Sequence, residues 1–293
     1  MKPRHFTPLI ACLGLSLLLV SGLSAPAAAQ PEHVNLTRFT FATQTVELQK
    51  ADGSISSAEF LFEAVLYPDG RANGGWGTWE HGTLDVLTLY RVVEGRVISD
   101  NRIGPFYTFT AKRLSPLSED ELTVILRPSP GSVPTGTVTF FIDGIAQAPL
   151  SFEARGRVLS LSAASFSFGY INAPPQTVVV QTHRGSYTAN IENVALVFPS
   201  GGAIGLLALS GPDGEPQDFH VVAGDIQFRA GAAPTILLRA READRDAAPG
   251  DDIIIIIRPG PEPFEPCRIY DIAGTNVGLV RFEAQSSITV FRD

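Results

Sequence analysis

The stretch Gln44–Gln49 reads QTVELQ, and a close copy of it, QTVVVQ, returns at Gln176–Gln181, 132 residues further along the chain. Further matches follow in the same order, at offsets of 129 to 131 residues: Tyr67–Gly70 with Phe198–Gly201, Tyr90–Gly95 with Phe219–Gly224, Asp120–Pro128 with Asp251–Pro259, and Phe152–Ala154 with Phe282–Ala284. One match of this length is uninformative, but the shared order is not. The chain is therefore predicted to consist of two tandem homologous units of about 130 residues, 30–161 and 162–293.

Each unit reads as a series of strands separated by turns. Phe39 and Phe41 alternate with polar neighbours, which is the period of a half-buried strand. The turn at Tyr67–Gly70 contains a proline that presets φ and a glycine that allows the reversal. No window has a convincing long helical period. We therefore expect an all-β fold of two β-sandwich-like or barrel-like units, packed closely or fused into one body.

The second unit contains Ile253–Ile257, five β-branched residues with no polar residue between them. Such a run is typical of a strand that is buried on both faces, so we expect it inside the protein or between the two units. Charged residues and a proline flank the run and disfavour edge-to-edge pairing. A hydrophobic partner site is the alternative interpretation.

The first residues have the order of a secretory signal peptide. A short positive segment precedes an apolar run over 9–23, and Ala27-Ala28-Ala29 supplies a small-residue cleavage site. Cleavage of 1–29 would leave a mature chain without a membrane span, either secreted, periplasmic or at a bacterial cell surface. As an alternative, the residues that end at Cys12 resemble a lipoprotein box, which would acylate that cysteine.

Composition excludes some classes of partner. The chain has 30 acidic and 22 basic residues and a net charge of −8, which disfavours binding to nucleic acid or anionic lipid. Of the two cysteines, cleavage would leave Cys267 alone, so no internal disulfide is expected. Burial of a hydrophobic core must then hold the fold together.

The segment Gly74–Gly82, GGWGTWEHG, is the densest candidate binding site. It holds both tryptophans, Trp76 and Trp79, beside Glu80 and His81. Aromatic faces can stack on sugar rings while a carboxylate or imidazole holds a hydroxyl group. These four residues therefore predict a glycan-binding site in the first unit.

Core packing is the competing interpretation of the two tryptophans. In a strand, Trp76 and Trp79 point to opposite faces and cannot form one stacking platform. The repeat aligns Trp76 with Leu207 and Trp79 with Ser210. That alignment predicts that Trp76 lies in the core and Trp79 at the surface.

A second candidate site is acidic. Asp244, Asp246, Asp251 and Asp252 flank a short turn in the second unit. Oxygen ligands gathered in a loop can hold Ca²⁺, the one cofactor that the sequence suggests. The spacing matches no tight calcium loop and arginines lie among the acids, so a solvated acidic turn is the alternative.

The sequence contains no recognisable catalytic constellation. The histidines of the mature chain, His33, His81, His183 and His220, are spread without metal-type spacing, and no nucleophile elbow, zinc-protease or phosphate-loop motif occurs. The leading hypothesis is a secreted non-catalytic binding or surface-structural protein, with a polysaccharide or another surface protein as partner. The alternatives are a secreted enzyme that acts on a polysaccharide or small lipid through Glu80 or His81, and an assembly protein that joins copies through strand edges.

Overall fold

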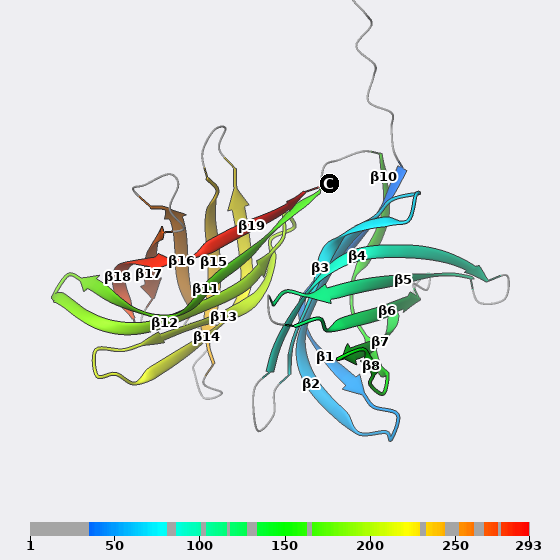
Figure 1. Ribbon diagram of the computed structural model, residues 1–293, viewed down its shortest axis with the longest axis horizontal. Coiled ribbons are helices and arrows are strands. Elements are labelled where there is room, and N and C mark those ends of the chain that lie inside the picture. Colours follow the sequence, from blue (N-terminus) through cyan, green and yellow to red (C-terminus); the bar gives the residue numbers. More distant parts are fainter. Residues whose placement is uncertain are drawn as a thin grey trace, which may run out of the picture. The chain divides into compact units, whose positions relative to one another are not determined.

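The computed structural model describes residues 35–80, 86–100, 104–115, 118–127, 134–162, 166–228, 233–243, 252–260, 267–274 and 277–292. Within these ranges the chain forms strands and turns and no helix. Two antiparallel sheets each close into an eight-stranded barrel (Figure 1). The predicted all-β fold of two tandem units is confirmed, and the units are barrels. The expected signal peptide, 1–29, lies outside the described residues.

The first barrel is built from the first ten strands. They are β1 (Asn35–Gln49), β2 (Ile55–Leu66), β3 (Arg71–Glu80), β4 (Val86–Asp100), β5 (Gly104–Arg113), β6 (Glu121–Arg127), β7 (Thr135–Ile142), β8 (Ile145–Ala146), β9 (Leu150–Glu153) and β10 (Arg157–Ser162). Eight of these strands, β1–β7 and β9, form the ring, which closes because β9 pairs with both β7 and β1. The strands β8 and β10 extend the sheet through pairs with β7 and β1.

The second barrel repeats this order with the remaining strands. They are β11 (Ser167–Thr182), β12 (Gly185–Val197), β13 (Gly202–Ser210), β14 (Pro216–Gln227), β15 (Thr235–Glu242), β16 (Asp252–Pro259), β17 (Cys267–Gly274), β18 (Gly278–Gln285) and β19 (Ser287–Arg292). Here β11 pairs with β12 on one side and with β19 and β18 on the other.

Both barrel interiors are filled with side chains. In β6, Leu122, Val124 and Leu126 point inward and are fully buried. Each barrel has its own cluster of buried apolar residues, one centred on aromatic rings and the other on aliphatic side chains. Alternate residues of a strand face the interior of a small barrel, so this packing leaves the other set of side chains on the outer wall.

The isoleucine run differs from its expected position. Ile253, Ile255 and Ile257 are buried in the second barrel, but Ile254 is 39% exposed and Ile256 is half-buried. The prediction that the run is buried on both faces or lies between the units is wrong. The strand β16 belongs to a single-layered barrel wall, and β-branched residues suit its outer face as well as its inner face.

The two barrels share backbone irregularities as well as sequence. A β-bulge interrupts the pairing after Phe41 in β1 and after Ala173 in β11, 132 residues later. Gly70 and Gly201 take left-handed φ angles of 87° and 89° in equivalent turns. Because only glycine adopts this conformation without strain, the turn glycines of the repeat are explained by backbone geometry.

A glutamine side chain closes each barrel beside its bulge. The Gln44 amide donates to the Arg155 carbonyl at 2.7 Å and accepts the Arg155 N–H at 2.7 Å. Gln176 makes the same pair with Gln285, at 2.7 and 2.8 Å. We call the line along which β1 meets β9 and β10, and β11 meets β18 and β19, the seam. Side-chain hydrogen bonds replace backbone pairing at this point of each seam.

A third apolar cluster joins the two barrels, and the strands from both belong to one compact unit. Equivalent positions of the repeat contribute to it from both sides, such as Leu36 with Phe168 and Val65 with Leu196. We call this cluster the docking interface. It uses the same wall of each barrel, which is the arrangement of an isologous contact.

Candidate functional site

The predicted glycan-binding segment is part of β3, where its side chains alternate between two environments. Trp76 is fully buried inside the first barrel. Its ring lies 4.7 Å from Phe60, 5.9 Å from Phe62 and 5.5 Å from Phe152, measured between centroids. The expected core position of Trp76 is confirmed.

Trp79 points outward from the first barrel but does not reach solvent. It is 4% exposed, belongs to the docking interface and contacts the His220 ring with a centroid distance of 3.6 Å. The expected surface position of Trp79 is wrong because the second barrel covers this face. The alignment of Trp79 with Ser210 compares equivalent positions of the two copies. It carries no information about which faces of the two barrels contact each other.

The glycines around the tryptophans allow the two barrels to approach. A Cβ on Gly75 would lie 2.8 Å from Phe198, and a Cβ on Gly77 would overlap the side chain of Ile204. The second barrel has Leu206 and Ala208 at these places. The glycines of β3 therefore allow the second barrel to pack closely against this strand.

The remaining residues of this prediction are only partly described. Glu80 is half-buried at the end of β3 and pairs with Ala58 and Val86 in the sheet. His81 lies outside the described residues. Glycan contact through Trp76, Trp79, Glu80 and His81 stays a prediction, and the burial of both rings leaves it without an exposed stacking face.

The acidic candidate site is also described in part. Asp244, Asp246 and Asp251 lie outside the described residues. Asp252 forms ion pairs with Arg239 at 3.7 Å and Arg241 at 3.2 Å. In the described part of the chain, no three His, Cys, Asp or Glu side chains gather in a way that could hold a metal ion. Calcium binding stays a prediction.

One buried charged group at the docking interface was not singled out by the sequence. Glu63 is 1% exposed, forms an ion pair with Arg38 and accepts a hydrogen bond from the Ser200 hydroxyl of the second barrel. The guanidinium of Arg38 also lies 5.6 Å from the Phe166 ring centre. Because every partner is a protein group that holds the barrels together, we interpret this cluster as structural.

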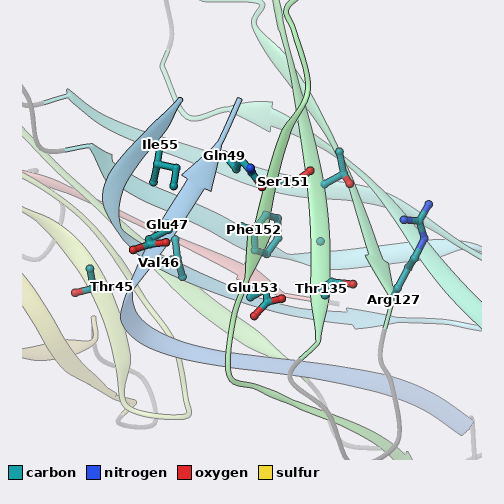
Figure 2. Close-up of a pocket in the computed structure, with 12 residues that line it drawn as sticks. Thr45, Val46, Glu47, Gln49, Ile55, Arg127, Thr135, Ser151, Phe152 and Glu153 are labelled. Atoms are coloured by element: carbon teal, nitrogen blue, oxygen red, sulfur yellow. The ribbon is translucent and has the colours of Figure 1, made fainter. Parts of the chain in front are cut away.

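A groove opens on the outer wall of the first barrel, along its seam (Figure 2). It has a volume of about 460 Å³ and is lined by residues from β1, β2, β6, β7 and β9. Arg127 lies at one end and Glu47 at the other, with Ser151 and Glu153 between them (Figure 2). We call this hollow the seam groove.

The pairing register explains the order of residues across the seam groove. Arg127 pairs with Thr135, and Thr135 pairs with Glu153, so these residues form one row across β6, β7 and β9. The ladder between β1 and β9 consists of the single pair Gln49–Ser151 in the described strands. Continuing this register by two residues places Glu47 opposite Glu153.

The second barrel fills the corresponding position with an ion cluster. Asp271 accepts hydrogen bonds from Arg258 and from Arg281. We call this arrangement the Asp271 clamp. The groove beside it has a volume of about 350 Å³ and is lined by Arg281, Glu283 and neighbouring residues. The first barrel has no such clamp, because Thr137 and Ser151 occupy the places of Asp271 and Arg281 in the pairing pattern.

Sequence reasoning used the seam residues only as markers of duplication. Arg127 belongs to the repeated Arg-Pro pair and Glu153 to the repeated Phe-Glu-Ala motif. Both side chains are exposed on the outer wall. The sequence did indicate this site in one way: these two charged residues recur at outward-facing positions in both copies.

Comparison with known proteins provides no further identification: no protein-family model, curated protein or solved structure matches the chain. The part of the chain that the structure describes contains no helix with the length and hydropathy needed to cross a membrane.

Proposed function

We propose that this chain is a secreted, non-catalytic binding protein whose ligand contacts lie on the outer wall of the first barrel. The observation that supports the proposal is the seam groove with its volume of about 460 Å³. Its charged side chains Arg127, Glu47 and Glu153 form no ion pair among the described residues. A hollow with convergent polar groups is the usual form of a binding site.

The filled interiors also favour contacts on the outer wall. Small barrels that carry a ligand inside leave an internal cavity for it, whereas both interiors here are packed with buried apolar side chains. The docking interface takes up one wall of each barrel. The seam groove lies on a wall that remains exposed, since Thr45, Glu47 and Gln49 on its β1 side all face solvent.

The second barrel suggests a variant that tests the proposal without disturbing the fold. Thr137→Asp together with Ser151→Arg transfers the Asp271 clamp to the first barrel, beside the existing Arg127. The same combination of side chains is accommodated in the second barrel, so we expect the double variant to fold. It should occupy part of the groove and give Arg127 a carboxylate partner.

The experiment is a thermal-unfolding screen of the full chain against polysaccharides, peptides and small zwitterions. A ligand that binds only the folded state raises the midpoint of unfolding. Stabilisation of the wild type that disappears in T137D/S151R would support the proposal. If no compound stabilises the wild type at millimolar concentration, or if stabilisation persists in the double variant, the groove is not the binding site. Turnover of any screened compound would contradict the non-catalytic part.

A further inference from the structure

We infer that the seam groove binds a basic amino acid, either as the free zwitterion or as the C-terminal residue of a peptide. The inference rests on the proposed binding function and adds the chemical class of the ligand. It follows from a comparison of residues that occupy the same place in the strand pairing of the two barrels.

The second barrel shows where the ligand carboxylate would lie. Arg258 pairs with Ile269 as Arg127 pairs with Thr135, so the two arginines are equivalent. In the same way, the pair Asp271–Arg281 corresponds to the pair Thr137–Ser151. The Asp271 carboxylate accepts from Arg258 in the second barrel. In the first barrel the arginine is retained, but its carboxylate partner is replaced by threonine.

This exchange leaves a carboxylate-sized place with suitable donors around it. Arg127 is exposed, and its one described interaction is with the Phe106 ring, 5.9 Å from the guanidinium. The Thr137 and Ser151 hydroxyls line the same groove. A ligand carboxylate there would receive charge-assisted hydrogen bonds from the guanidinium, which are stronger than those between neutral groups.

The other end of the groove is acidic and would bind a cation. Glu47 and Glu153 line the same groove, and the register of the Gln49–Ser151 pair, continued by two residues, places them opposite one another. Neither carboxylate has a cationic partner among the described residues. Like charges that face each other across strands are destabilising, and an ammonium group between them would remove the repulsion. The second barrel has Val179 in the place of Glu47, so this acidic pair is specific to the first barrel.

The two ends together match one class of ligand. The groove offers one positive and two negative side chains. A basic amino acid such as lysine offers the complement, one carboxylate and two ammonium groups. Ser151 and Glu153 lie two residues apart on the same face of β9, a distance of about 7 Å along the strand, which an extended lysine side chain spans.

The test is a titration of the full chain, followed by NMR at low ionic strength because surface charges are screened by salt. The probes are L-lysine, Nα-acetyl-L-lysine as a stand-in for a C-terminal residue, cadaverine without a carboxylate, and hexanoate without an ammonium group. We expect L-lysine or its acetyl derivative to bind at least about tenfold more tightly than cadaverine and hexanoate, because each loses one end of the match. Binding of the acetyl derivative equal to that of lysine would indicate the peptide source, and binding of lysine alone the free amino acid.

Variants separate the two ends of the groove. Arg127→Gln should weaken lysine binding about tenfold and leave cadaverine unchanged, whereas E47Q/E153Q should weaken both. Arg157→Gln and Ser160→Arg change exposed residues of β10 outside the groove and should have no effect. Thermal unfolding of each variant verifies that it is folded.

The outcomes of the two proposals can be told apart. Absence of lysine and acetyl-lysine binding at millimolar concentration, or unchanged lysine binding by Arg127→Gln, overturns the inference. If a different compound then stabilises the wild type and not T137D/S151R, the proposed function stands without the basic amino acid. If T137D/S151R binds lysine as the wild type does, the ligand lies elsewhere and both proposals fail.

Discussion

Replacement of Gly77 by alanine tests how closely the two barrels are docked. An added Cβ would overlap the Ile204 Cγ2 atom of the second barrel and lie 3.2 Å from Leu89 Cδ2. Ile204 is fully buried, so it has little room to move. The equivalent residue of the second barrel is Ala208, which shows that alanine itself is compatible with this strand. Overpacking should therefore lower the free energy of unfolding by about 1–3 kcal/mol.

A double-mutant cycle assigns this cost to the contact between the barrels. Ile204→Ala should by itself cost about 2–5 kcal/mol, because it empties a buried site. In that background the added methyl group of G77A has space, and its cost should fall to near zero. The expected coupling energy is about 1 kcal/mol or more. Ala208→Gly, which changes the matching position of the second barrel, should show no coupling to Ile204→Ala of this kind.

The assay is urea unfolding followed by tryptophan fluorescence, since both tryptophans are buried, Trp79 in the docking interface and Trp76 inside the first barrel. Far-UV circular dichroism on the same samples reports both barrels. If G77A is as stable as the wild type, or if it costs the same with and without Ile204, then Ile204 does not pack against Gly77 and the described docking is incorrect.

Three further perturbations test other parts of the fold. Glu63→Ala removes the buried acceptor of Arg38 and should cost about 2–4 kcal/mol in chemical denaturation, and an unchanged midpoint would contradict the structural role of Glu63. Burial raises the pKa of Tyr90 from 10.0 to about 12. The wild type should therefore lose about 2 kcal/mol of stability as the pH rises from 10 to 12, and Tyr90→Phe should not. Parallel alkaline denaturation curves of the two proteins would refute this. Gln44→Ala and Gln176→Ala should each cost about 1–3 kcal/mol and increase amide exchange at the matching seam alone; exchange that spreads equally over both barrels would argue against local closure.

The duplication and the strand content could be predicted from sequence because they leave periodic, local signals. The offset of 132 residues between Gln44 and Gln176 corresponds to an equivalent bulge and an equivalent amide bridge. The glycines of the repeated turns recur for backbone reasons that are the same in each copy. Such features depend on neighbours in sequence, and a single chain is enough to reveal them.

The position of Trp79 could not be predicted, because it depends on the contact between two copies that differ on the contact face. The signal was nevertheless present in a different form: Gly75 and Gly77 stand where the second copy has Leu206 and Ala208. A loss of side chains on one copy alone indicates close approach of another body. The choice between a sandwich and a barrel also depends on long-range closure, which involves β1 and β9, about a hundred residues apart.

The seam groove shows the same limit on a smaller scale. Arg127 and Glu153 repeat in both copies, but Thr137 and Ser151 have no counterpart of the same type. Their equivalence to Asp271 and Arg281 becomes visible only through strand register. Once the strand register is known, positions at which the two copies differ identify the groove as clearly as positions at which they match.

The docking interface has a consequence for how the chain arose. Because equivalent positions such as Val65 and Leu196 meet from both sides, the contact has the form of a symmetric homodimer whose two subunits have become one polypeptide. A single-barrel ancestor would have carried the same apolar wall and would have paired with itself through it. Fusion freed each half to diverge, and Gly77 on one side and Trp79 facing His220 across the contact are traces of that divergence. Either barrel produced alone would expose its apolar half of the docking interface to solvent and should associate with a second copy.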